Sequence, residues 1–144
     1  MNYLLLISHG GLARGLKESL AMFAGDKIDE VIALGLKEGQ TVDQFGVEVK
    51  EALSFLKGED SLVVVADIVG GSPLTTACSV LAELGKLETA TVLGGMNLTM
   101  ALTALVMKDN LDGEALAEAI LAEAASALQE FTVASDEDGD DDDI

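Results

Sequence analysis

The chain has 144 residues, a length that suits one domain with a single hydrophobic core and is short for two. Hydrophobic residues make up 49% of it but aromatic residues only 3%, so the core must consist mainly of aliphatic side chains. The net charge of −18 repels nucleic acid and anionic lipid, which argues against DNA binding and favours basic protein partners.

The negative charge is concentrated near the carboxyl terminus. Seven of the 26 acidic residues lie within residues 136–144, so the rest of the chain carries −11, which is the total of −18 less those seven. A dense block of like charges buries no apolar surface and is typical of disordered segments. We therefore expect one folded domain over residues 1–134 and a disordered acidic tail over residues 135–144.

The first half of the chain alternates continuous apolar runs with amphipathic segments. Residues 3–8 (YLLLIS) form an apolar run, and after the loop at residues 9–11 apolar side chains recur at helical spacing as far as Gly25. Residues 28–34 fit a second strand, and residues 42–56 carry an apolar face typical of a second helix. The pattern predicts two strand–helix units in succession.

A third unit begins with the most β-rich segment of the chain. Residues 61–66 (SLVVVA) lack the alternation of a half-exposed strand, which predicts a central strand covered on both faces. Asp67 follows this strand directly. After the segment IVGGSP, residues 74–84 fit a helix, with Ser72 expected as its N-cap and Pro73 at its first position.

The remaining sequence repeats the same order of elements. We expect a fourth strand over residues 87–93, a helix that ends near Met107, a last helix over residues 113–129 and a short closing strand at residues 131–133. Strands that alternate with helices predict an α/β, doubly wound fold with a mainly parallel four-stranded sheet. Right-handed crossovers then place helices on both faces of the sheet.

Two further features bear on where the protein works. The amino-terminal run has no basic region and no small-residue cleavage pattern, so we interpret it as a strand, and no stretch has the length of a membrane span. The single cysteine, Cys78, cannot form an internal disulfide and falls in a predicted helix, where we expect a buried packing residue. These features predict a reducing, cytoplasmic setting.

His9 is the only histidine, and it stands at the carboxyl end of the first predicted strand. In an open α/β sheet the ligand crevice lies beyond the carboxyl ends of the strands, where connections diverge to opposite faces. An imidazole with the reference pKa of ~6.5 is substantially neutral at cellular pH, so a ring nitrogen can act as a nucleophile toward phosphorus. The alternative is a structural histidine that bonds to a main-chain carbonyl.

Asp67 ends a strand that we expect beside the first one. If the two strands are neighbours, the carboxylate can accept a hydrogen bond from one ring N–H of His9. This contact fixes the tautomer and raises the nucleophilicity of the other ring nitrogen. An aspartate that only caps a turn is the alternative.

Three loops at the same edge contain paired glycines, at residues 10–11, 70–71 and 94–95. Glycine allows the backbone to approach a ligand closely. The main-chain N–H groups around Gly71 and Ser72 lack intrahelical acceptors, and with the Ser72 hydroxyl they could bind a phosphoryl oxygen. An ordinary Ser-Pro helix start without a ligand is the alternative.

The sequence contains no motif for nucleotide binding, metal binding or serine-hydrolase chemistry. It contains no Walker loop, no GxGxxG, no Cys/His metal spacing and no nucleophile elbow. We therefore predict no metal and no cofactor, and we expect another protein to donate the phosphoryl group. Asn97 could face the same edge but is equally a good N-cap, and Arg14 could neutralise phosphate charge although a solvated arginine is the more common case, so both stay outside the predicted site.

Three motifs taken together resemble a known family. The first strand ends in SHGG, the third is followed by DIVGGSP and the fourth by GGMN. Over about residues 1–134 the chain resembles the IIA component (EIIA) of mannose-family sugar phosphotransferase systems (PTS). Thr99 departs from the family pattern, in which proline often stands at this position after the asparagine, here Asn97.

The resemblance implies a role for each site residue. His9 would accept a phosphoryl group from the histidine phosphocarrier HPr, Asp67 would orient its ring, and the Ser72 hydroxyl would lie near the phosphoryl group. The IIB component would then take the group during sugar uptake and phosphorylation. The protein is thereby expected to be a phosphotransferase component that works through a phosphohistidine.

The resemblance also implies an assembly. Family members are typically homodimers, in which an antiparallel edge strand is exchanged between subunits, and residues 131–133 match that strand. The acidic carboxyl terminus replaces the linker to a fused IIB, so IIB is expected to be a separate chain. The membrane components IIC and IID would be indirect partners.

Three alternatives give distinguishable expectations. The phosphoryl-donor subunit of dihydroxyacetone kinase resembles the same fold but usually carries an MGS-type turn after its aspartate, unlike residues 70–73 here. A non-catalytic regulator would still dock to its partners after replacement of His9. A nucleotide-binding module would show nucleotide affinity by itself, which a phosphocarrier does not need.

Overall fold

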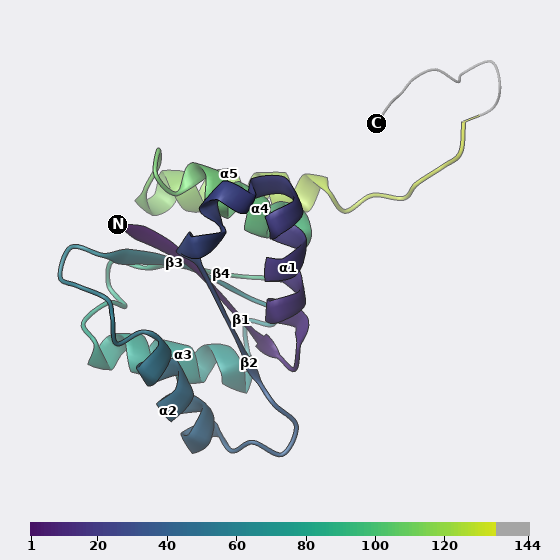
Figure 1. Ribbon diagram of the computed structural model, residues 1–144. Helices are drawn as coiled ribbons and strands as arrows, with labels where there is room; N and C mark the ends of the chain where they lie inside the picture. Colours follow the sequence, from purple (N-terminus) through teal and green to yellow (C-terminus); the bar gives the residue numbers. More distant parts are fainter. Residues whose placement is uncertain (135–144) are drawn as a thin grey trace.

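The computed structural model of the chain describes residues 1–134 (Figure 1). Strands and helices alternate along it, which confirms the predicted α/β class. The elements are, in chain order, β1 (Asn2–His9), α1 (Leu12–Ala24), the 3₁₀ helix η1 (Gly25–Glu30), β2 (Val31–Leu36), α2 (Val42–Ala52), β3 (Ser61–Ala66), α3 (Ser72–Glu83), β4 (Thr91–Gly94), α4 (Leu98–Met107) and α5 (Gly113–Ser126).

The four strands form one parallel sheet in the order β2-β1-β3-β4. Strand β1 therefore lies between β2 and β3, which confirms the predicted neighbourhood of β1 and β3, and Ile7 pairs with Ala66 of β3. The chain leaves β1 toward α1 on one face of the sheet and leaves β3 toward α3 on the other. The carboxyl ends of β1 and β3 thus form the switch point at which doubly wound folds bind their ligands.

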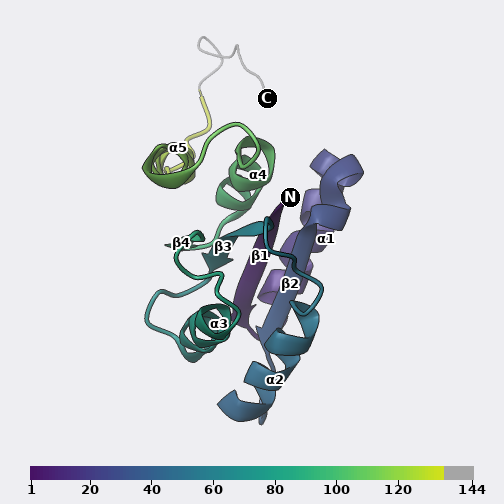
Figure 2. The ribbon, with the colours of Figure 1, turned by 90° about the vertical axis from the view of Figure 1, so that its left-hand side faces the viewer.

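Two hydrophobic clusters cover the two faces of the sheet. Helices α1, α4 and α5 pack on one face, against β1 residues such as Leu4 and Leu6. Helices α2 and α3 pack on the other face, against the intervening β1 residues Leu5 and Ile7. Figures 1 and 2 show these helix layers on opposite sides of the strands. Burial on both faces explains why β1 and β3 are continuous apolar runs without alternation.

Local signals start two of the helices. The Thr41 hydroxyl accepts the Gln44 N–H, while the Gln44 side chain accepts the Thr41 N–H, which forms a capping box before α2. The Asn97 side chain accepts the Met100 N–H at 2.7 Å and donates to the Ala124 carbonyl at 3.2 Å. Asn97 therefore caps α4 and ties it to α5, which agrees with its exclusion from the predicted site.

Several predicted boundaries were wrong by a few residues. Strand β2 begins at Val31 rather than at residue 28, because the chain first winds into η1. Strand β4 begins at Thr91 rather than at residue 87, because the Ala90 N–H closes a turn onto the Leu87 carbonyl at 3.1 Å. Helix α5 ends at Ser126, before the predicted residue 129.

The segment after α5 has no regular secondary structure within this chain. Residues 128–134 form neither helix nor strand, and Leu128, Phe131 and Val133 are 76%, 86% and 81% exposed. A strand needs a neighbour for its main-chain groups, and residues 131–133 have none in a single copy. Exchange of this segment between subunits therefore stays a prediction. The segment predicted to be a disordered tail, residues 135–144, lies outside the described residues.

Cys78 lies in α3, as expected, but it is half-buried rather than fully buried. It packs against the cluster beneath α2 and α3, and this burial raises the pKa of its thiol. Within residues 1–134, none of the helices combines the length and the apolar character needed to span a bilayer.

Candidate active site

The structure brings His9 and Asp67 together at the carboxyl edge of the sheet. His9 is the last residue of β1, and Asp67 directly follows β3, with its N–H bonded to the Ile7 carbonyl at 3.2 Å. The His9 Nδ1 atom lies 2.9 Å from Asp67 Oδ2. This contact agrees with the geometry predicted from the sequence, since parallel neighbours place their carboxyl ends at one edge.

Asp67 is held by main-chain as well as side-chain bonds. Its Oδ2 atom also accepts the His9 main-chain N–H at 2.9 Å, and Oδ1 accepts the Ile68 N–H at 2.8 Å. Burial alone would raise the pKa of Asp67, but these bonds from His9 and Ile68 outweigh it and hold the pKa below its ordinary value. The carboxyl group is therefore ionised at neutral pH.

An ionised carboxylate fixes the tautomer of the neutral imidazole. It can only accept hydrogen bonds, so Nδ1 of His9 must carry the proton and donate it to Asp67. The other nitrogen, Nε2, then keeps its lone pair. The His9 side chain is 47% exposed and that of Asp67 only 11%, so the orienting group is covered while the ring remains accessible. This arrangement suits a nucleophile that reacts with a macromolecular partner.

Gly71 lies directly beside the ring. A Cβ atom at this position would stand 2.8 Å from Cε1 and 3.5 Å from Nε2 of His9. The first distance is shorter than real Cβ atoms approach other atoms, so a side chain at this position would require the His9 ring to shift. The structure thus brings three of the predicted residues, His9, Asp67 and Gly71, into one cluster.

Ser72 corrects one detail of the sequence analysis. It is the first residue of α3 rather than the N-cap, and the cap position belongs to Gly71. The Ser72 side chain makes no capping hydrogen bond, and the Gly71 carbonyl instead accepts the N–H and the hydroxyl of Thr75 at 3.2 and 3.1 Å. Ser72 nevertheless adjoins the cluster, in the first turn of α3.

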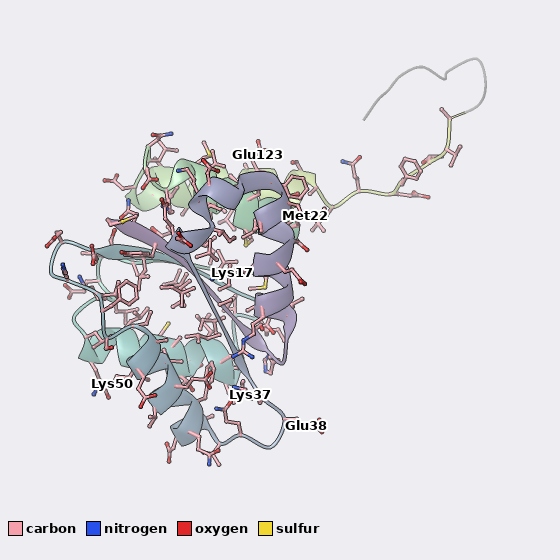
Figure 3. The ribbon with its side chains drawn as sticks, in the orientation of Figure 1. Lys17, Met22, Lys37, Glu38, Lys50 and Glu123 are labelled. Atoms are coloured by element: carbon pink, nitrogen blue, oxygen red, sulfur yellow. The ribbon has the colours of Figure 1, made fainter. Side chains whose placement is uncertain are left out.

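Arg14 and Lys37 lie near this edge but are engaged by Glu48. Lys37 follows β2 at the end of the sheet that carries the site, where Figure 3 shows it beside Glu38. Its Nζ atom lies 3.3 Å from the Glu48 carboxylate, and a guanidinium nitrogen of Arg14 lies 3.7 Å from it. The side chain of Gln40 donates to Glu48 at 3.0 Å, and this bond is the largest cause of the lowered pKa of Glu48. These ion pairs agree with leaving Arg14 outside the predicted site.

Sequence reasoning missed two residues that shape the turn after His9. Ser8 is completely buried, and Gly35 of β2 pairs with it across the sheet. The signal for Ser8 is a hydroxyl at the end of an apolar strand, and the signal for Gly35 is a glycine inside one. Among residues 1–134, no cluster of His, Cys, Asp or Glu side chains is arranged to hold a metal ion.

Comparison with known proteins places this chain in a family. The family model described as "PTS system fructose IIA component" matches residues 3–121. The fructose-specific EIIA component of the phosphotransferase system of Bacillus subtilis (strain 168) is 28% identical over 132 residues, which cover 92% of this chain and 86% of that protein.

Solved structures share the fold. The mannose/sorbose-specific IIA subunit from Enterococcus faecalis has a TM-score of 0.76 at 23% identity, over 93% of this chain and 97% of that one. A PTS IIA protein associated with the fucose utilization operon of Streptococcus pneumoniae has a TM-score of 0.70 at 26% identity, over 90% of this chain and 92% of that one.

The family model covers most of the chain and includes the strand ends that form the cluster. The chain therefore belongs to the fructose/mannose IIA family of the sugar phosphotransferase system, and it is a phosphocarrier component of that system.

Proposed function

We propose that Nε2 of His9 accepts a phosphoryl group from phospho-HPr and passes it to the IIB component. The observation that carries this proposal is the 2.9 Å contact between Nδ1 and Asp67, which leaves Nε2 as the nucleophilic nitrogen of a half-exposed ring. Family membership supports HPr and IIB as partners. The group would ultimately reach sugar through IIB and the membrane components IIC and IID.

The transfer requires no proton movement at His9. The Nε2 lone pair forms a bond to phosphorus while the phosphorus–nitrogen bond of the donor breaks, and that electron pair returns to the donor imidazole. Nδ1 keeps its proton throughout. The phosphorylated ring gains positive charge, which the ionised Asp67 stabilises at 2.9 Å. Transfer to IIB is the same displacement with His9 as the leaving group.

Gly71 and Ser72 would receive the phosphoryl oxygens. The Ser72 N–H has no intrahelical acceptor and lies at the positive end of the dipole of α3, whereas the Gly71 N–H donates to the Ile68 carbonyl at 3.5 Å and Pro73 has no N–H. The Ser72 hydroxyl makes no capping bond, which leaves it available as a further donor. The missing side chain of Gly71 gives the phosphoryl group room beside Nε2.

The test is phosphorylation by phosphoenolpyruvate, enzyme I and HPr, followed by intact-mass analysis. The wild type should gain one acid-labile phosphoryl group, and His9→Gln should gain none. Because His9 is the only histidine, no other imidazole can substitute for it. An unmodified wild type, or a His9→Gln variant that is still phosphorylated, would contradict the proposal. Docking of HPr that survives His9→Gln is expected, since contact and transfer are separate properties.

A homodimer with exchanged carboxyl-terminal segments also belongs to this proposal. Leu128, Phe131 and Val133 expose apolar side chains, and β4 is an edge strand of the sheet. An edge strand can bond to a segment from another copy. Sedimentation of the full chain should give a dimer, and a chain shortened to residues 1–127 should lose it. A monomeric full chain would refute the exchange while leaving phosphorylation of His9 untouched.

A further inference from the structure

The turn that follows His9 is held in an unusual conformation. Gly10 has a φ angle of +56°, and its N–H donates to the Leu36 carbonyl of β2 at 2.7 Å. The preceding N–H, that of His9, donates to Asp67. The main-chain N–H groups of two successive residues in this turn, between β1 and α1, therefore donate to different neighbours. One bonds to the main chain of β2, and the other bonds to the Asp67 side chain after β3.

The Ser8 hydroxyl makes hydrogen bonds to the same turn. Its side chain is completely buried at the end of an apolar strand, and its Oγ atom accepts the Ala13 N–H of α1 at 2.8 Å. The hydroxyl also donates to the Gly10 carbonyl at 3.4 Å. A single hydroxyl thus connects the residues before and after His9 with the first turn of α1.

Gly35 makes space for the Gly10 carbonyl. It pairs with Ser8 in the register of β1 and β2. A Cβ atom at Gly35 would stand 1.9 Å from the Gly10 oxygen and 3.1 Å from the Gly10 carbonyl carbon. Any side chain at Gly35 would therefore displace the main chain of the turn. Gly10 can point its carbonyl over β2 only because this strand has no side chain there.

We infer that Ser8 and Gly35 are positioning residues for phosphoryl transfer. They act through the Gly10 carbonyl, which sets the direction in which His9 leaves the sheet and so the contact of Nδ1 with Asp67. This inference rests on the proposed role of His9 as phosphoryl acceptor. Burial of a lone hydroxyl at the end of an apolar strand is unfavourable unless it is hydrogen-bonded, and the partners of this hydroxyl are the Gly10 carbonyl, next to the nucleophile, and the Ala13 N–H in the first turn of α1.

Two matched pairs of variants isolate the hydroxyl. The wild type and Ser8→Ala differ by the hydroxyl alone. Ser8→Thr and Ser8→Val have side chains of the same shape, and only the threonine carries a hydroxyl. Gly35→Ala tests the second contact. For each chain we would measure kcat and KM with phospho-HPr, the imidazole nitrogen chemical shifts by NMR and the thermal unfolding midpoint. The single histidine makes the imidazole signals unambiguous.

The expected result is a loss in kcat rather than in KM. Ser8→Ala and Ser8→Val should lower kcat about ten- to a hundredfold, the scale of a small misplacement of a reacting group, with KM within about twofold. Ser8→Thr should stay near the wild type. The nitrogen shifts should report one tautomer, protonated at Nδ1, in the wild type and in Ser8→Thr, and tautomer averaging in the two variants without the hydroxyl. Gly35→Ala should resemble Ser8→Ala.

Three outcomes would overturn the inference. Wild-type kcat and a single tautomer in Ser8→Ala, with only the unfolding midpoint lowered, would make the hydroxyl a stability element. Failure of both Ser8→Ala and Ser8→Val to fold would lead to the same conclusion. Equal loss of kcat in Ser8→Thr and Ser8→Val would show that shape matters and the hydroxyl does not. Failure of the proposed function is distinguishable, because the wild type itself would then remain unphosphorylated while the tautomer measurement still reads the positioning.

Discussion

The two ends of the sheet differ in how far charged and titratable side chains are buried. At the amino end, the Lys108 side chain is only 1% exposed, and its Nζ atom contacts Glu30 at 2.5 Å and Asp109 at 3.3 Å. Lys86 is also buried there, and its Nζ atom donates to the carbonyls of Lys57, Gly58 and Asp60. At the carboxyl end, the His9 side chain is 47% exposed.

The difference separates structural groups from reactive ones. A buried ammonium must be fully bonded, because desolvation of an unpaired charge is unfavourable, and such a group has no capacity left for a ligand. His9 has one ring nitrogen engaged by Asp67 and the other free to react. Loss of a buried amino-end ammonium group should therefore lower stability and leave transfer unchanged, whereas loss of a carboxyl-end group should slow transfer, whatever it does to stability.

The largest effect is expected for Asp67→Asn. The amide can offer only one acceptor atom, whereas the carboxylate accepts from both His9 and Ile68 with its two oxygens. Phosphoryl transfer should fall on the order of a hundredfold or more, as expected when the carboxylate that orients a histidine is replaced by a neutral amide. Asp109→Asn, at the amino end, is the control and should transfer within about twofold of the wild type. Equal losses in both variants would remove the distinction between the ends.

Lys108→Met should lower stability by about 2 kcal/mol without slowing transfer. This loss is smaller than that on breaking a fully buried pair, because the Glu30 and Asp109 side chains are 20% and 45% exposed. The change leaves Glu30 beside Asp109 without the buried cation that both contact. Lys50→Met is the matched control, because the 3.4 Å pair of Lys50 and Glu83 is exposed by 59% and 61%, and Figure 3 shows Lys50 on the outer surface of α2. It should change stability by less than ~0.5 kcal/mol. Denaturant unfolding followed by circular dichroism measures the stability changes of both variants. A slower transfer in Lys108→Met would contradict the comparison.

Gly10→Ala should lower stability by about 1 kcal/mol. The φ angle of +56° is unfavourable for any residue with a Cβ atom, and no atom lies within 4 Å of the added methyl, so backbone strain is the whole effect. Gly15→Ala is the control in the interior of α1, where alanine also meets no atom and should stabilise by up to ~1 kcal/mol. Destabilisation of similar size in both variants would rule out this account of the turn.

The smallest effect is expected in the acid dependence of stability. Burial raises the pKa values of both Asp67 and Asp109, but hydrogen bonds outweigh it and each pKa lies below its ordinary value. A lowered folded pKa means that the carboxylate stabilises the fold above its unfolded pKa of ~3.9 and that this stabilisation is lost as pH falls through the lower folded pKa.

The stability gap between wild type and Asp67→Asn should therefore be constant near neutral pH and shrink as the pH falls below about 4. Asp109→Asn should show the same sign with a smaller gap, because the Asp109 side chain is 45% exposed and its ion pairs are screened by solvent. Urea unfolding across this pH range measures both gaps. A gap that widens toward acid would contradict the lowered pKa values.

Much of the site follows from local patterns in the sequence. Apolar runs of strand length with helical segments between them predict the parallel sheet, and the carboxyl ends of neighbouring parallel strands share an edge. His9 and Asp67 stand at such ends, so their contact could be predicted although 58 positions separate them. Gly71 could be placed near them for the same reason, because it follows the same strand as Asp67.

The tertiary structure alone decided the rest. Gly71, and not Ser72, occupies the cap of α3, and a side chain at Gly71 would require the His9 ring to shift. The roles of Ser8 and Gly35 depend on the register between β1 and β2, and that register carries no signature in either strand by itself. By itself the sequence determined the order of the strands and main helices, the buried face of the amphipathic helices and the burial of β1 and β3 on both faces, since helical spacing and continuous apolar runs are local patterns. Which atoms then meet across the sheet is set by register and packing, and these are properties of the whole fold.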